Sequence, residues 1–149
     1  MISRILVPTD GSKVAQKAAQ YAIALARKTG AAILLLSVID KRFLVVRSIP
    51  STASPTHLIE PIEEYLRQAA EIYLKEIEEL CKKNKVRSKT SIRTGHPIEE
   101  ILKEVKKSKI DLIVMGSHGR NALKAAVIGS VAFGVIHKET KAPVLIVKK

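Results

Sequence analysis

Short apolar runs alternate with segments of helical periodicity along the whole sequence, and this alternation is the feature that most constrains the fold. Most of the runs are continuous, as in strands buried on both faces, whereas the segments between them repeat apolar residues every three or four positions. Strands are predicted at residues 5–7, 32–39, 86–93, 110–115 and 144–147. Helices are predicted at residues 13–29, 58–84 and 130–138, and another begins at Pro97.

Strands that alternate with helices predict an α/β fold in which a parallel sheet carries helices on both faces. Right-handed crossovers and the common doubly wound arrangement give a Rossmann-like, five-stranded sheet in the order 3-2-1-4-5. The third strand suits an edge, because one of its faces carries Arg87, Lys89 and Arg93. The winding then reverses between the first and fourth strands, so a ligand is expected at their carboxyl ends.

The length and composition indicate one domain over residues 1–149, with 46% apolar residues. No apolar run approaches the roughly 18 residues that a membrane-spanning helix needs, and the N-terminus has no signal-peptide layout. The single cysteine, Cys81, excludes an internal disulfide. We therefore expect a cytoplasmic protein without a membrane partner.

The net charge of +12 raises the question of nucleic acid. Aromatic residues, on which bases could stack, make up only 3% of the chain and are scattered. A solvated basic surface is therefore the favoured interpretation, and a basic nucleic-acid-associated protein is the less favoured one.

A glycine cluster follows the predicted fourth strand. Gly116 and Gly119 are separated by two residues, and after nine more residues Gly129 precedes Ser130. Glycine adopts positive φ without strain and has no Cβ, so the backbone N–H groups of such a turn can approach an anion. We expect a phosphate here, and we expect a valine side chain at position 129 to occupy the phosphate space.

The turn after the first strand, Pro8-Thr9-Asp10, would lie beside the glycine turn, and either Asp10 or Ser12 could cap the next helix. Arg120 is a better phosphate ligand than His118, which we interpret as an exposed loop residue. The histidines and Cys81 show no metal-like spacing, and no catalytic base can be identified.

Together these residues resemble the universal stress protein family, in its ATP-binding (UspA-like) form. The glycine spacing, the start at residues 4–12 and the end at residues 142–148 all match the family pattern. The resemblance implies that Pro8, Thr9, Asp10 and the backbone of Val38 contact adenine and ribose. It implies a nucleotide-binding set of Pro8, Thr9, Asp10, Val38, Met115, Gly116, Ser117, His118, Gly119, Arg120, Gly129, Ser130 and Val131.

The function implied by the resemblance is a nucleotide-dependent regulatory or sensor module of the stress response. ATP or another adenine nucleotide, with Mg²⁺ or Mn²⁺, would be the cofactor, and the Ser130 hydroxyl could bond a phosphate or help hold the metal. Efficient catalysis is not expected, although slow or partner-dependent ATP hydrolysis is left open. The alternative from another class is a nucleotide-independent, homodimeric interaction scaffold.

The predicted last strand, Val144 to Val147, is apolar throughout yet lies at a sheet edge. Pairing with the same strand of a second copy would cover it and give a homodimer, which the resemblance also implies. Two segments are harder to interpret: a long loop at residues 40–56, and residues 121–128, where a helical turn is one reading.

Overall fold

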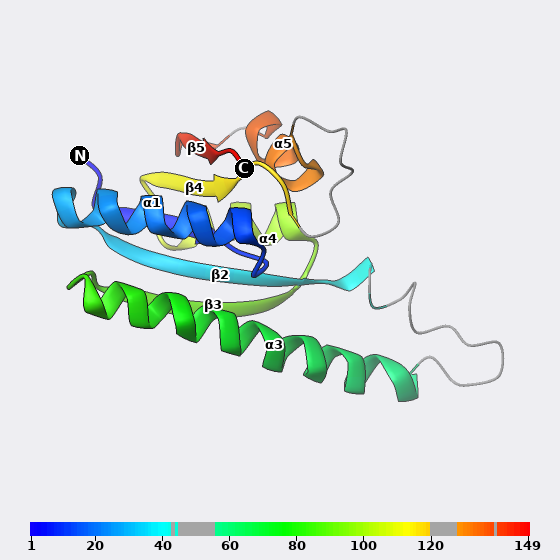
Figure 1. Cartoon of the computed structure of the whole chain (residues 1–149). Helices are drawn as coiled ribbons and strands as arrows, with labels where there is room; N and C mark the ends of the chain where they lie inside the picture. The colour runs from blue at the N-terminus through cyan, green and yellow to red at the C-terminus, as the bar shows by residue number, and fades with distance from the viewer. Residues whose placement is uncertain (43, 45–55, 120–127, 139) are drawn as a thin grey trace.

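The computed structural model describes residues 1–42, 44, 56–119, 128–138 and 140–149. Element labels follow Figure 1. In chain order the elements are β1 (Arg4–Pro8), α1 (Lys13–Thr29), β2 (Ala32–Asp40), α3 (Thr56–Lys83), β3 (Ser88–Gly95), α4 (Pro97–Lys107), β4 (Leu112–Gly116), α5 (Ser130–His137) and β5 (Val144–Val147). The strands form one sheet in the order β3-β2-β1-β4-β5, and every neighbouring pair is parallel. The predicted fold class and strand order are therefore confirmed.

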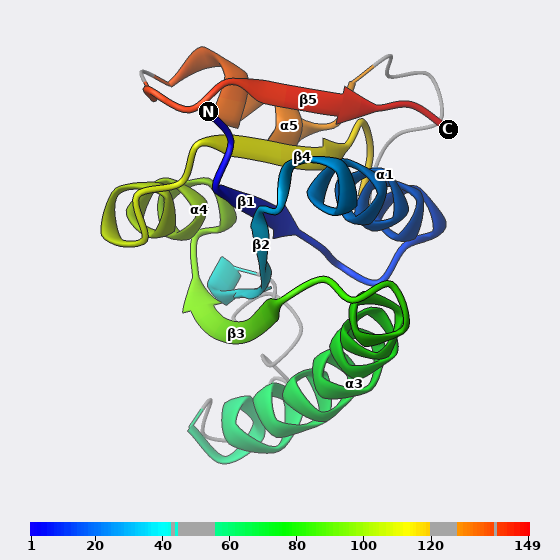
Figure 2. The same cartoon turned by 90° about the vertical axis from the view of Figure 1, so that its left-hand side faces the viewer.

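Alternate side chains of the strands belong to two separate hydrophobic cores, one on each face of the sheet. Helices α1 and α3 cover one face, and α4 and α5 cover the other (Figure 2). On one face, Ile5 and Val7 of β1 pack against α1 and α3. On the other face, Leu6 of β1 packs with residues of α4 and α5. All three β1 residues are fully buried, which explains why the run is continuous and not alternating.

Helix α1 begins and ends where its sequence signals predict. Ser12 Oγ accepts a hydrogen bond from the Ala15 N–H at 3.2 Å, so Ser12 is the N-cap. Gly30, with φ 77°, ends the helix, and its N–H donates to Ala26 O. The buried face is mainly alanine, which lets the helix backbone lie close to the sheet.

Helix α3 packs one side of its apolar surface against the sheet. Ala70, Leu74, Ile77 and Cys81 are buried against the sheet, whereas Leu80 is 38% exposed. Apolar residues occupy two neighbouring stripes of this helix, so periodicity alone did not separate the packed stripe from the outer one. Cys81 belongs to the packed stripe, and its side chain is fully buried.

Two predicted strands begin later than expected. Val86 lies in the turn after α3, where its N–H donates to Cys81 O, and β3 starts at Ser88. Ile110 and Asp111 likewise precede β4. Most of the predicted loop at 40–56 and most of the linker at 121–128 lie outside the described residues.

The edge strand β3 is tied to α4 by a charged network. Arg93 pairs with Glu104, which is 4% exposed, and its second nitrogen lies 3.4 Å from Glu100 Oε2. Ser108 Oγ donates a second hydrogen bond to Glu104. Burial acts to raise the pKa of Glu100, but hydrogen bonds from Lys103 and Arg93 outweigh it and hold that pKa below its usual value.

None of the helices in the described part of the chain combines the length and the apolar character that crossing a membrane requires.

Arg93→Met should destabilise the protein by about 2–3 kcal/mol at pH 7, because it leaves the Glu104 carboxylate buried without its cation. Urea unfolding measures this loss, and Lys89→Met, at an exposed position of the same strand, is the control. The lowered pKa of Glu100 stabilises the fold above the unfolded-state pKa, and this contribution is lost as the pH falls through the folded-state pKa. The difference in free energy of unfolding between wild type and Arg93→Met should therefore become smaller in acid. An equally large loss of stability in Lys89→Met would show that the ion pair is not the cause.

Candidate functional site

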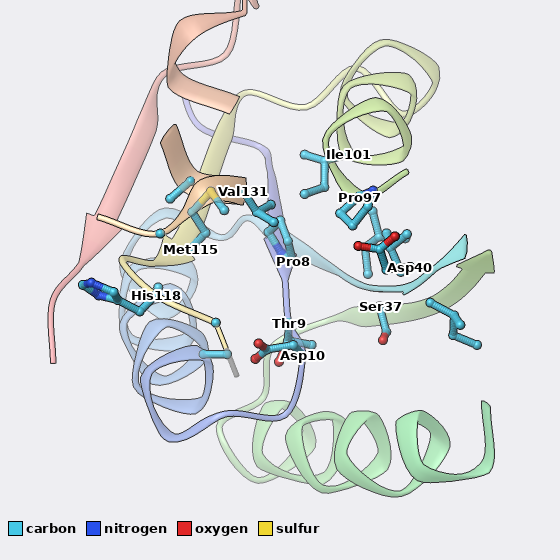
Figure 3. A pocket seen from close by; sticks show the side chains of 18 of the residues that line it. Pro8, Thr9, Asp10, Ser37, Asp40, Pro97, Ile101, Met115, His118 and Val131 are labelled. Carbon is cyan, nitrogen blue, oxygen red and sulfur yellow. The ribbon is translucent and has the colours of Figure 1, made fainter. Parts of the chain in front are cut away.

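A cavity of about 650 Å³ opens at the carboxyl ends of β1 and β4, where the winding of the sheet reverses. Figure 3 shows His118 at one end of it and Asp40 with Pro97 at the other. Its lining includes Pro8, Thr9, Asp10, Val38, Met115, Gly116, Ser117, His118, Gly119, Gly129, Ser130 and Val131. All the predicted site residues thus lie around one cavity, apart from Arg120, which is outside the described residues.

The turn after β1 is held by its own side chains. Thr9 is buried, and its N–H donates to Leu36 O of β2 at 2.8 Å. Asp10 Oδ1 accepts from the Ser12 N–H at 2.9 Å, and Gly11 has φ 78°. An Asx turn and a left-handed glycine therefore fix where Thr9 and Asp10 meet the cavity.

The two halves of the glycine motif are joined by a backbone hydrogen bond. The Gly129 N–H donates to Ser117 O at 2.5 Å, while the Ser117 N–H donates to Val147 O of β5 at 2.8 Å. The Ser117 hydroxyl lies 2.8 Å from His118 Nδ1. The start of α5 is thereby anchored on the end of β4.

Each motif glycine allows a close approach within the protein. A Cβ at Gly116 would lie 2.8 Å from Val14 Cγ1 and 3.3 Å from the Ala15 nitrogen, against the first turn of α1. A Cβ at Gly119 would lie 2.7 Å from Asp10 Oδ2. The absence of a Cβ thus brings β4, α1 and the turn after β1 together.

Two expectations about these glycines were wrong. Positive φ does not explain them, because the left-handed glycines are Gly11 and Gly30. A Cβ at Gly129 would lie 3.1 Å from Ser117 O and 3.2 Å from His118 Cα, so it would meet the backbone of the neighbouring turn before any ligand. A valine at position 129 would therefore disturb the protein itself and is a poor probe of phosphate space.

Helix α5 presents free backbone donors to the cavity. Gly129 is its N-cap and has no side chain with which to cap it. The first intrahelical bond runs from the Phe133 N–H to Gly129 O at 2.9 Å, so the N–H groups of residues 130–132 have no partner within the helix. This end of the cavity suits an anion.

The opposite end of the cavity arises because β1 is shorter than β2. Pro8 pairs with Leu36, whereas β2 continues to Asp40. Every second residue of a parallel strand bonds to the same neighbouring strand. Ala32 and Leu36 bond to the β1 side, so the N–H and C=O of Val38 also point to that side, where β1 has already ended. The Val38 backbone can therefore bond to the edge of a planar ligand.

Several cavity residues were missed by sequence reasoning. Arg42 binds Asp40 through a salt bridge of 3.0 Å. Burial acts to raise the pKa of Asp40, but hydrogen bonds from the Arg42 side chain and backbone outweigh it and lower that pKa overall. The Ser37 hydroxyl is hydrogen-bonded to the Tyr73 hydroxyl. The one available signal was position, since Asp40 directly follows a predicted strand at the ligand-binding end of the sheet.

The metal-coordinating side chains of the cavity suit a metal ion that binds together with a phosphate ligand better than one that the protein holds by itself. Among the described residues no group of three or more His, Cys, Asp or Glu side chains could hold a metal ion. Mg²⁺ commonly takes most of its ligands from phosphates and water, with one or two protein oxygens. Asp10 and Ser130 could supply such oxygens, since both line the cavity.

Gly116→Ala should destabilise the protein by about 1–3 kcal/mol, because the new methyl group overpacks the contact with α1. Thermal or urea unfolding measures the loss. The same substitution should cost less in a Val14→Ala background, where the side chain nearest to the new methyl group is shortened. An equal cost in both backgrounds would show that this packing contact is not the cause.

The comparisons with known proteins agree with the fold and the motif. The model of the universal stress protein family matches residues 1–148. Universal stress protein MJ0531 of Methanocaldococcus jannaschii is 36% identical over 149 residues, which cover 100% of this chain and 84% of the relative. The solved structure of MJ0577, from the same organism, is similar with a TM-score of 0.87 and 32% identity, covering 100% of this chain and 97% of that one.

Two more distant solved structures contain nucleotides. A universal stress protein in complex with cAMP has a TM-score of 0.71 and 19% identity, with 98% of this chain and 97% of that chain covered. An Arabidopsis thaliana family member with AMP bound has a TM-score of 0.65 and 23% identity, with 99% and 92% covered. At these identities the likeness concerns the fold. The family model and the MJ0531 relative, which both span essentially the whole chain, carry the conclusion that this protein belongs to the universal stress protein family.

Proposed function

We propose that this chain binds ATP, or another adenine nucleotide, and acts as a nucleotide-dependent regulatory or sensor module of the stress response. The observation that carries the proposal is the uncapped N-terminus of α5, which faces the same cavity as Thr9 and Asp10. The cavity volume of about 650 Å³ lies within the range of small-molecule sites. The cAMP and AMP found in two structural neighbours support a nucleotide of this class.

The phosphates bind at the α5 end of the cavity. There the N–H groups of residues 130–132 and the Ser130 hydroxyl offer donors, and the helix dipole favours negative charge. The resemblance to the family assigns Arg120, which is outside the described residues, to the phosphates as a forked cation. Mg²⁺ or Mn²⁺ arrives with the phosphates, and Asp10 or Ser130 supplies a protein oxygen to it.

The adenine lies at the β2 end of the cavity. Pro97 and Ile101 contribute apolar surface at that end (Figure 3), and the Val38 backbone offers one donor and one acceptor to the base edge. The ribose lies between the two ends, near Asp10. Adenine contacts made by backbone groups need no polar side chain, which accords with the apolar lining.

Sensing follows from where the ligand is held. A nucleotide that contacts both the turn after β1 and the turn after β4 stabilises one arrangement of the two, and this shifts affinity for a protein partner. Efficient hydrolysis is not part of the proposal, since no catalytic base was identified from the sequence.

Isothermal titration with ATP and Mg²⁺ should give saturable heat for the wild type. Ser130→Asp should weaken ATP binding at least about tenfold, because it places a carboxylate against the phosphates. It should leave adenosine binding unchanged and should not lower the melting temperature, since a carboxylate in the first turn suits a helix N-terminus.

Gln20→Glu, at an exposed α1 position outside the cavity, makes the same charge change and should leave ATP affinity unaltered. Absence of binding by ATP, AMP and cAMP at millimolar concentration would contradict the proposal and favour the nucleotide-independent scaffold.

The proposed module is a homodimer joined through β5. This strand lies at a sheet edge and is apolar throughout, and its residue Leu145 is 41% exposed. An uncovered apolar edge favours pairing with another strand. A two-fold pairing of β5 with its copy would extend the sheet and remove both edges.

Leu145→Lys should convert the dimer to a monomer, because it places a charge in the centre of the shared edge. Light scattering after size exclusion measures the mass. The control Tyr21→Lys replaces an exposed large side chain on α1, outside β5, and should leave the dimer intact. A monomeric wild type would remove this part of the proposal without affecting nucleotide binding.

A further inference from the structure

Lysine and arginine gather at the end of the sheet opposite the cavity. Since all strands are parallel, every helix-to-strand connection lies at this end, which is on the left in Figure 1 and faces the viewer in Figure 2. We call this the basic end; it carries Arg4, Arg27, Lys28, Lys82, Lys83, Lys85, Arg87, Lys106, Lys107, Lys109, Lys138 and Lys141. Nearly half of the 26 Lys and Arg residues of the chain are concentrated here.

A hollow of about 240 Å³ lies in the basic end, between the last turns of α1 and α3. Arg27, Lys85 and Arg87 line it, and none of its lining residues is acidic. Arg27 Nη1 donates to Asn84 Oδ1 at 3.4 Å, and Arg87 Nη2 donates to Gly30 O at 3.5 Å. Both bonds are long, and each guanidinium carries further N–H groups for a ligand.

In the described part of the chain, the carboxylates of the basic end are engaged away from the three cations that line the hollow; Glu79, for example, pairs with Lys82. Glu104 is paired with Arg93, and Asp111 Oδ2 accepts the backbone N–H groups of Ser3 and Arg4 at 2.8 and 2.9 Å. None of the ion pairs within the described part of the chain includes Arg27, Lys85 or Arg87. The three cations that line the hollow therefore leave an excess of positive charge there.

Helix dipoles explain only part of the cluster. Cations in the last turns of α1, α3 and α4 interact favourably with the carbonyl ends of these helices. Arg4, Lys85, Arg87 and Lys109 lie beyond those helices, in the connections and at the start of β1. Their positions widen the charge from the hollow across the end of the sheet.

The composition of the basic end indicates the partner. Among the described residues, exposed aromatic side chains lie within the helices, at Tyr21, Tyr65 and Phe133. Single-stranded nucleic acid and protein partners both favour aromatic anchors, whereas the sugar–phosphate backbone of a duplex needs only spaced cations. We propose that the basic end binds the phosphate backbone of double-stranded nucleic acid without reading its sequence, with one phosphate in the hollow between Arg27, Lys85 and Arg87.

The test measures fluorescence anisotropy of a labelled 20-base-pair DNA duplex of arbitrary sequence, titrated with the protein at several salt concentrations. The triple variant Arg27→Gln, Lys85→Gln, Arg87→Gln should bind at least about tenfold more weakly at low salt, and its plot of log affinity against log salt should be shallower by about two to three. The matched control, Lys13→Gln, Lys17→Gln, Lys75→Gln, removes the same charge from exposed positions outside the basic end and should retain most of the affinity.

Lys85→Asn supplies a milder variant that should fold normally, because Lys85 has φ 57° and asparagine tolerates left-handed backbone. Its slope should fall by about one. Three results would overturn the proposal: no duplex binding by the wild type at low salt, an equal loss in the matched control, or tighter binding to phosphatidylserine vesicles than to the duplex. The last result would assign the basic end to an anionic membrane surface.

Discussion

The candidate site depends on the point at which β1 leaves the sheet. The Thr9 N–H makes the last bond of β1 to β2, and the chain then turns into α1. Pro8, whose position in the alternation faces β4, offers no N–H on that side. Strand β2 continues to Asp40 without β1 as a neighbour. The resulting gap gives the cavity its floor and leaves the Val38 backbone directed into it. A longer β1 would fill the same space with a buried strand.

The glycine motif completes the site through packing. Gly116 lets β4 reach the first turn of α1, Gly119 lies against Asp10, and Gly129 rests on the Ser117–His118 backbone. These approaches fix the α5 N-terminus relative to the turn after β1. The long spacing between the glycines is therefore a property of tertiary structure, because the residues meet across a turn and not along one loop. The N–H groups that suit a phosphate become available as a consequence of this packing.

The sequence predicted the parts of the fold that local chemistry determines. Continuous apolar runs identified four strands, and alternation identified the third. Gly30 and Ser12 bounded α1, and the strand order followed from the doubly wound pattern. The packed face of α3 and the contributions of Asp40, Arg42 and Tyr73 could not be predicted, because each depends on which element lies opposite. The role of Gly129 was misjudged for the same reason: its absent Cβ would meet residues that are distant along the chain, and spacing alone does not show this.

The polarity of a parallel sheet gives its two ends opposite characters. At the carboxyl end helices begin, so backbone donors and positive dipole ends face the cavity. At the amino end helices finish, and their negative ends favour the lysines and arginines of the last turns. The helix ends stabilise those cations without a carboxylate partner, so their positive charge is available to a ligand in solvent. The same winding that creates a site for a small anion at one end therefore permits an extended positive surface at the other.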